Sequence, residues 1–429
     1  MIEATIETAL TIFLMFALIA QLVAIRFKIP YTLVFVFIGV GITTLSAVAL
    51  SISSNATIFF TPISWIQSVY YQLVNSGLFV GLIVPPLIFE AMMHIRRENL
   101  NAVAKPALIL ATVGVLISTI VAGVVVWKFT GLSPFLSLVF AAIISPTDTI
   151  TVLQIFKHLK VPSKLSTLMD MEAALNDATA IVLFSIILSI SSVSLLQSSI
   201  FRDVGIFLYD LIGGFLIGII ISRLAKPIHA SIDDKLAEII LTVVVVYGSY
   251  VLATALGASG LIAVTIVGLY FGNNTARMTL KKKLKLPIMY FWEIAAFMGN
   301  AIAFFLIGFV VNISLLLQAA ALIIIAYLST IISRLVTVYP IFALFHNPRN
   351  GIPFKWSNIA FLGGIRGALS IALVATLTSS AVISSQDLST ITTMVIGVVF
   401  VSIILQVPAL SIYAGKFFGK YHTAYPAND

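Results

Sequence analysis

The sequence predicts an all-α polytopic membrane protein with about thirteen transmembrane helices. Of its 429 residues, 60% are hydrophobic and only 9% are charged, whereas a soluble domain carries about a quarter charged residues. The formal net charge of +8 comes from basic residues in short loops, which indicates orientation in a bilayer rather than nucleic-acid binding. The chain has no cysteine, so disulfides and thiolate metal sites are excluded.

The predicted spans are apolar windows of roughly 20 residues, the length that crosses a bilayer. In order along the chain they are 6–25, 31–50, 77–95, 106–127, 133–156, 167–195, 204–222, 236–256, 258–272, 288–311, 314–344, 357–379 and 388–415. The segments between them are too short for a soluble domain, so residues 1–429 are expected to form a single transmembrane unit.

Loop charge predicts the orientation of these spans. All but four of the 24 Lys and Arg residues fall on one predicted side of the membrane. Lys128 and Arg202 lie on the other side, and Arg334 and Arg366 lie within spans. Basic loops are cytoplasmic, so we expect a cell-membrane protein with its N-terminus outside and its C-terminus in the cytoplasm.

Helix-breaking residues recur at corresponding places in the two halves of the chain. An odd number of spans predicts two inverted six-helix repeats, 1–195 and 236–415, joined by a linker helix at 204–222. The fifth span is interrupted at Ser145-Pro146-Thr147-Asp148, and the twelfth at the Gly-Gly-Ile-Arg-Gly segment 363–367. Paired interruptions of this kind indicate the binding site of a transporter. We therefore predict that helices 5 and 12 are broken and cross.

Carboxylates at membrane depth are the second functional signal, because they mark ion or proton pathways. Asp148 lies in the fifth span and Asp177 in the sixth. Glu172 lies about 140° around the helix from Asp177, so the two acids address different neighbours. We expect Glu172 to meet a cation, Arg334 or Arg366, and Asp177 to face the opening beside the broken fifth helix. The alternative for Glu172 and the arginines is internal ion pairing that only specifies packing.

The balance of deep charges favours a coupled carrier. Four acids, Glu90, Asp148, Glu172 and Asp177, outnumber the two arginines within spans, so some carboxylate is left to bind a proton or a metal cation. Burial favours the protonated carboxyl, and proton and cation then compete for the same oxygens. Because the bare anion crosses a bilayer at high cost, the site should cross only when it is loaded.

Four segments together resemble the monovalent cation:proton antiporters, in the NhaP-type branch that includes the animal sodium/proton exchangers. They are SPTDT through EAALNDATAIVLF (145–184), PPLIFEAMMHIRRENL (85–100), FWE with a downstream asparagine (291–300) and GGIRGALS (363–370). The resemblance implies that Asp177 is the principal ion and proton carboxylate. Thr147, Asp148 and Glu90 would then contribute ligands to a monovalent metal cation.

The resemblance also implies the supporting residues and the transport reaction. Glu172 would pair with Arg334, and Arg366 would stabilise the crossing. The implied reaction is exchange of sodium for a proton by alternating access in a homodimer, with no cofactor besides the transported Na⁺ (or Li⁺/K⁺) and H⁺. Asn176 stands where electrogenic relatives have a second aspartate, which implies electroneutral exchange. Ala173 replaces the serine of the common ESLFND motif, so a hydroxyl ligand is absent there.

Other functions compete with this interpretation. A potassium/proton exchanger on the same scaffold stays open, because selectivity depends on cavity geometry that a sequence does not show. A cation channel would also need buried carboxylates, but it has no need of paired helix breaks. An enzyme is not expected, since the spans contain no GxSG-with-histidine, HExxH or paired-aspartate protease arrangement.

Overall fold

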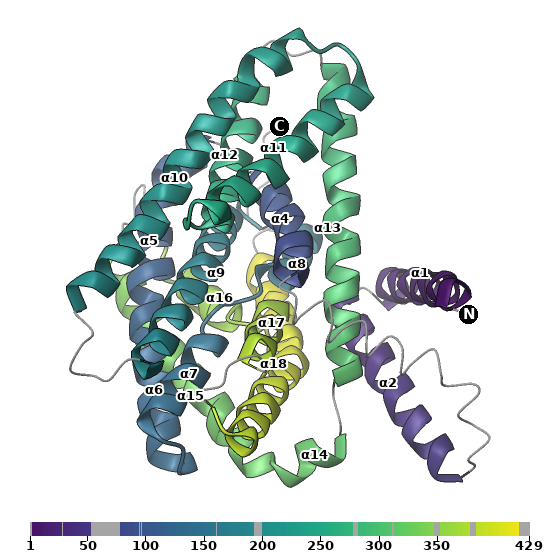
Figure 1. Cartoon of the computed structure of the whole chain (residues 1–429), viewed down its shortest axis with the longest axis vertical. Coiled ribbons are helices and arrows are strands. Elements are labelled where there is room, and N and C mark those ends of the chain that lie inside the picture. Colours follow the sequence, from purple (N-terminus) through teal and green to yellow (C-terminus); the bar gives the residue numbers. More distant parts are fainter. Residues whose placement is uncertain are drawn as a thin grey trace.

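The computed structural model describes residues 2–27, 29–52, 78–93, 95, 97–159, 161–192, 200–277, 282–310, 313–346, 352–377 and 383–419 (Figure 1). Its helices are α1 (Ile2–Phe27), α2 (Tyr31–Ile52), α4 (Leu78–Met93), α5 (Arg97–Ile109), η2 (Leu110–Gly114), α6 (Val115–Thr130), α7 (Pro134–Ile144), α8 (Thr149–Leu159), α9 (Ser163–Ser192), α10 (Ile200–Ser231), α11 (Lys235–Ala255), α12 (Gly260–Arg277), α13 (Lys282–Val310), α14 (Ile313–Gln318), α15 (Ala320–Leu344), α16 (Trp356–Leu362), α17 (Ala368–Thr376) and α18 (Ser385–Gly419). Apart from an isolated bridge between His346 and Ile352, these residues form no strand. The predicted all-α class is confirmed.

Apolar helices account for the predicted spans. Within the described chain, seven helices are long and apolar enough to cross a membrane: Val103–Thr130, Ser163–Leu188, Leu208–Ser231, Lys235–Ala255, Leu286–Phe305, Ala320–Leu344 and Ser385–Phe418. Five shorter apolar helices accompany them: Leu14–Phe27, Tyr31–Leu45, Gly81–Met93, Pro134–Ile144 and Gly260–Gly272. Each predicted span overlaps a helix, and the ends of some, such as 193–195 and 378–379, lie outside the described residues. The exact number of crossings and the inverted repeats stay predictions.

Both predicted helix breaks are present. The fifth span is divided into α7 and α8, and the twelfth into α16 and α17. Pro146 lies in the first break, where it has no backbone N–H to continue the helical ladder. Neighbouring residues also determine where α7 begins. The Ser133 hydroxyl accepts from the backbone N–H of Leu136 (3.2 Å), and Pro134 occupies the first helical position.

Two other spans differ from a single regular α-helix where no irregularity was predicted. The range 106–127 is shared by α5, the π-helical turn η2 and α6. Thr112, inside η2, donates its hydroxyl to the carbonyl of Leu108 (2.7 Å), a contact that competes with the helical ladder. The range 314–344 exceeds the roughly 20 residues that a bilayer needs, and its first part forms the separate helix α14, which has no buried residue.

The helices form two bundles. In the first bundle α1, α2, α4 and α10–α13 pack on one another, and Figure 1 shows α1 and α2 beside the long helix α13. The second bundle consists of α5–α9 with η2 and α15–α18. Each bundle takes helices from both halves of the chain, so the two predicted repeats interleave. The bundles meet where α9 contacts α4 and α12, and where α17 contacts α4 and α13.

Helices α2 and α13 approach most closely at two glycines. A Cβ atom at Gly39 would lie 2.6 Å from the carbonyl oxygen of Phe305, and one at Gly308 would lie 2.5 Å from that of Val36. Membrane helices have no hydrophobic driving force toward one another, so such close backbone approach supplies the packing attraction between them.

We expect Gly39→Ala to destabilise the protein, because the added methyl group clashes with backbone that cannot move away. The cost should be about 1–3 kcal/mol, as for other overpacked positions. Thermal unfolding of the purified protein in detergent measures it. Gly41→Ala, two residues along the same helix, is the matched control, because nothing lies within 4 Å of its added Cβ. Equal melting temperatures for the two variants would contradict the packing argument.

Candidate cation and proton site

The two broken helices cross and bond to each other at their breaks. The backbone N–H of Asp148 donates to the carbonyl of Ile365 (2.7 Å). Arg366 donates from Nη1 to the carbonyls of Ser145 (2.6 Å) and Pro146 (3.2 Å). A break leaves such carbonyls without the N–H of a following turn, and inside a membrane only protein groups can satisfy them. The guanidinium of Arg366 therefore holds the fifth-span break against the twelfth.

Asp148 is positioned by close packing and by a neighbouring hydroxyl. A Cβ atom at Gly367 would lie 2.5 Å from the Cβ of Asp148, so a larger residue there would displace the carboxylate. The hydroxyl of Thr151 donates to Oδ2 of Asp148 (2.6 Å) and lies 3.1 Å from the hydroxyl of Thr32. Half-buried Asp148 thus has a defined orientation within the break.

A neutral amide joins the break to α9. Nδ2 of Asn176 donates to the hydroxyl of Thr147 (2.7 Å), and both side chains are buried. The hydroxyl oxygen of Thr147 keeps a lone pair for a further partner, because it is the acceptor in this bond. Asn176 therefore fixes the position of Thr147 without adding a charge.

Glu172 forms a buried ion pair with Arg334, which joins α9 to α15. Nη2 of Arg334 also donates to the carbonyl of Ala360 on α16 (2.9 Å). The residues by themselves left Arg334 and Arg366 open as partners of Glu172, and the structure shows the pair with Arg334 that the resemblance implied. Neither member of the pair lines the cavity beside the crossing.

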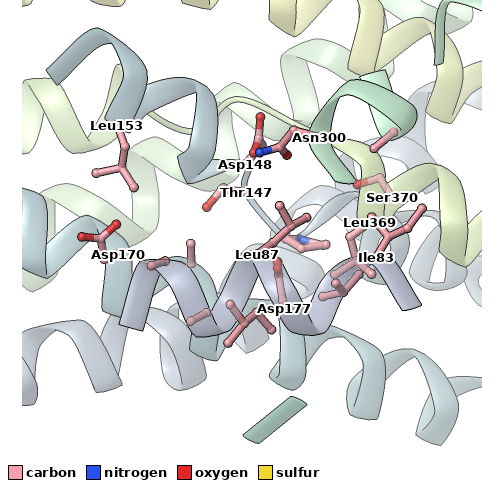
Figure 2. Close-up of a pocket in the computed structure, with 18 of the residues that line it drawn as sticks. Ile83, Leu87, Thr147, Asp148, Leu153, Asp170, Asp177, Asn300, Leu369 and Ser370 are labelled. Carbon is pink, nitrogen blue, oxygen red and sulfur yellow. The ribbon is translucent and has the colours of Figure 1, made fainter. Parts of the chain in front are cut away.

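Three carboxylates line that cavity, which encloses about 770 Å³ including the part open to solvent. They are Asp148 in the break and Asp170 and Asp177 on α9, and Thr147 lines the same space (Figure 2). No hydrogen bond or ion pair joins Asp177 to the rest of the described chain. Predicted ligands Asp177, Asp148 and Thr147 thus lie in one cavity. Glu90 is not among its lining residues.

The opposite wall of the cavity belongs to the first bundle and is almost wholly apolar. It comprises Ile83, Val84, Leu87, Ile88 and Ala91 of α4 with Asn300, Ala303 and Phe304 of α13. Among these residues only Asn300 has a polar side chain. Glu90 lies two turns after Ile83, at the margin of the cavity-facing side of α4. The acids of the cavity therefore all belong to the second bundle.

The charges of the lining suit a cation or a proton. No Lys, Arg or His is among the described residues that line the cavity. The described residues also contain no group of three or more His, Cys, Asp or Glu placed to hold one metal ion. The three carboxylates are therefore distributed along the cavity, an arrangement unlike the multi-carboxylate cage of a divalent ion.

Sequence reasoning missed two polar residues of the cavity, Asp170 and Ser370. Asp170 had a detectable signal: it precedes Asp177 by seven residues, which places both on one face of α9 two turns apart. Ser370 had none, because its position depends on where α17 begins after the break.

Comparison with known proteins agrees with this geometry. A family model described as sodium/hydrogen exchanger, transmembrane, matches residues 12–415. The chain belongs to the sodium/hydrogen exchanger family. It is thus a multi-pass membrane protein, as the apolar helices indicate.

Curated relatives carry antiporter names. The Na⁺/H⁺ antiporter ApNhaP of Aphanothece halophytica is 31% identical over 83% of this chain and 64% of its own length. The Na⁺/H⁺ antiporter NhaP of Pseudomonas aeruginosa is 31% identical over 82% of this chain and 84% of its own length. The chain thus spans somewhat less than two thirds of the length of ApNhaP.

A solved structure shares the fold. The sodium proton antiporter MjNhaP1 of Methanocaldococcus jannaschii, at pH 8, superposes with a TM-score of 0.75. The match covers 97% of this chain and 100% of that one, at 20% sequence identity. Two chains with few identical residues therefore share one arrangement of helices.

We expect Glu172→Gln and Arg334→Ala each to lower stability by about 3–5 kcal/mol, because either leaves a buried charge unpaired. The double variant should lose less than the sum of the two single losses. Unfolding midpoints of all four proteins in one detergent measure this coupling. Glu293→Gln makes the same change at an exposed site on α13 and should cost less than Glu172→Gln. Additive losses would show that Glu172 and Arg334 are not energetic partners.

Proposed function

We propose that the protein is a secondary antiporter that exchanges a monovalent cation, most simply sodium, for a proton by alternating access. The observation that carries the proposal is the cavity, where three carboxylates and no basic side chain line a space beside two broken helices. The family membership and the antiporter names of the relatives support it.

Competition at Asp177 would couple the two flows. Asp177 has no ion pair in the described chain, so its charge is available to a transported ion. The neutral forms of the site are a protonated carboxyl and a carboxylate with one bound monovalent cation. Because a bare carboxylate is costly at membrane depth, the empty anionic site crosses rarely. Loaded sites cross in both directions, and exchange results.

The ligands we propose for the cation are Asp177, Asp148 and Thr147. Glu90, at the edge of the cavity-facing side of α4, would contribute a further oxygen. Sodium is a hard cation that needs several oxygens. The carboxylates supply charge, and the hydroxyl of Thr147 is held in the cavity by Asn176. Glu172 with Arg334, and Arg366 at the crossing, hold the elements that carry these ligands.

The two bundles suggest how access alternates. All cavity carboxylates lie on the second bundle, and the facing wall of the first bundle is almost wholly apolar. A shift of one bundle along the other would carry the loaded site past that wall. The wall would exclude water from the site during the shift, which prevents ions from leaking through an open path.

The remaining assignments belong to the same proposal. The transporter would need no cofactor and catalyse no covalent reaction. It would lie in the cell membrane as a homodimer, with the N-terminus outside, as the basic loops on the opposite side indicate. The competing functions are potassium/proton exchange, which uses the same cavity, and a cation channel, which the paired breaks and apolar wall disfavour.

Asp177→Asn should abolish cation-driven proton movement without unfolding the protein, because it removes the charge and keeps the shape. The assay is pH change inside reconstituted vesicles after addition of Na⁺, Li⁺ or K⁺ in turn, which also identifies the preferred cation. Asp233→Asn, the same change at an exposed loop position, is the control and should transport normally. Cation-dependent proton flux retained by Asp177→Asn would overturn the role of Asp177.

The rate of exchange should not depend on membrane voltage, because Asn176 contributes no second charge. One carboxylate neutralised alternately by a proton or a monovalent cation carries equal charge in both directions. A moved elementary charge would otherwise couple at about 2.3 kcal/mol per 100 mV. Once the cation series has excluded a potassium response, vesicles clamped with potassium and valinomycin at several potentials measure this. A steep voltage dependence would mean more than one proton per cation, with Asp148 as the second carrier.

A further inference from the structure

Ser370 presents a buried hydroxyl to the cavity. Ser370 is 1% exposed, and its Oγ atom has no hydrogen-bond partner in the described structure. Ser370 lies on α17 and is among the residues that line the cavity, where Figure 2 labels it beside Leu369 and Asn300. A buried polar group without a partner is unfavourable. We therefore expect the Ser370 hydroxyl to bind a partner in the functioning protein.

The absence of a partner has a local cause in the helix break. Many serine and threonine residues inside the helices donate to a carbonyl three or four residues earlier, as Thr43 does to Gly39 (2.8 Å) and Thr265 to Leu261 (2.8 Å). Ser370 is the third residue of α17, which begins at Ala368. The residues three and four before Ser370 belong to the break, so no helical carbonyl accepts from it.

The position of Ser370 in the cavity is what distinguishes it. Four other hydroxyls in the described chain are also buried without a partner, those of Thr119, Ser137, Ser222 and Ser357. None of the four lines the cavity. These four hydroxyls are therefore controls: removing one of them removes a buried hydroxyl without changing the cavity.

Ser370 and Asp148 line the same cavity. Gly367, three residues before Ser370 in the chain, lines it too and packs directly against the Asp148 side chain. The start of α17 therefore lies beside Asp148, and Ser370 is the first residue of α17 with a hydroxyl.

On α9 the corresponding oxygen is missing. Ala173 lines the cavity one turn before Asp177, on the face that also carries Asp170. Its methyl group offers no ligand to a cation, although this is where the resembling antiporters often have serine. A hard cation such as sodium still requires several oxygens, and a hydroxyl from another helix can supply one.

We propose that the Ser370 hydroxyl is a ligand of the transported cation, which it coordinates together with Asp148 in place of the hydroxyl that Ala173 lacks. The proposal rests on the proposed function. It makes α17, the second half of the broken twelfth span, a direct participant in cation binding. The cation would then be held between both breaks, with α9 contributing Asp177.

The decisive variant is Ser370→Ala, compared with Ser357→Ala, which removes an equally buried hydroxyl outside the cavity. Ser370→Ala should raise the sodium concentration for half-maximal exchange about tenfold, the effect of losing one hydrogen-bond-strength contact to a charged group. Stabilisation of the purified protein by sodium against heat should weaken in parallel, because it reports binding without transport. Ser357→Ala should match the wild type in both measurements.

A rescue variant tests the replacement directly. Ala173→Ser in the Ser370→Ala background should restore sodium affinity to within about threefold of the wild type, because the new hydroxyl faces the same cavity. Ser370→Thr, which keeps the oxygen, should bind sodium like the wild type. If Ser370→Ala does not fold, Ser370→Cys decides, because a sulfur atom keeps the volume and is a poor ligand for a hard cation.

The outcomes separate this proposal from the proposed function. A wild-type protein with no cation-dependent proton flux would refute the antiporter function itself. Normal wild-type exchange with unchanged sodium affinity in Ser370→Ala, or in Ser370→Cys if that variant is needed, would refute only the role of Ser370. Lower sodium affinity in both Ser370→Ala and Ser357→Ala would also refute it, because the effect would then be a general one of lost buried hydroxyls.

Discussion

The structure depends on one constraint: inside a bilayer every backbone polar group must be bonded by the protein. The breaks between α7 and α8 and between α16 and α17 release carbonyl and amide groups at membrane depth. Asp148 and Arg366 satisfy them across the crossing, the first through its amide and the second through its guanidinium. This arrangement makes broken backbone stable where only helices are usually tolerated. It also leaves side chains, Thr147 and Ser370 among them, directed into a cavity rather than into a helical ladder.

The same helix carries one acid with a structural role and another with the proposed transport role. Glu172 on α9 is neutralised by Arg334 and lies outside the cavity, whereas Asp177, about 140° around the helix, lines it. The ion pair ties α9 to α15 and, through the carbonyl of Ala360, to α16. The position of Asp177 on α9 is therefore linked to α15 and α16. A single helix thus carries one acid whose charge is fixed and another whose charge can change.

Sequence reasoning succeeded where the signal was local. Apolar windows located the helices, and Pro146 and the 363–367 glycines marked the breaks, because bilayer thickness and backbone chemistry act on neighbouring residues. Reasoning failed where position depends on tertiary geometry. The residues by themselves left the partner of Glu172 between two arginines, and only the resemblance named Arg334. The lining of the cavity by Ser370 was not foreseen, and Asp170 was overlooked beside the more prominent motif. Glu90 was proposed from its charge and from the resemblance, and the lining of the cavity shows that it lies at the edge of the site.

The apolar wall of α4 and α13 has a mechanical consequence. Relative motion of two protein surfaces is slow when many hydrogen bonds must rupture together, because each broken bond adds to the barrier before a new one forms. Among the described residues of this wall only Asn300 has a polar side chain, so displacement would exchange one aliphatic contact for another of similar strength. Such an interface offers only a low free-energy barrier to sliding. In the exchange proposed above, it would let the second bundle move past the first without a deep free-energy minimum on either side of the membrane.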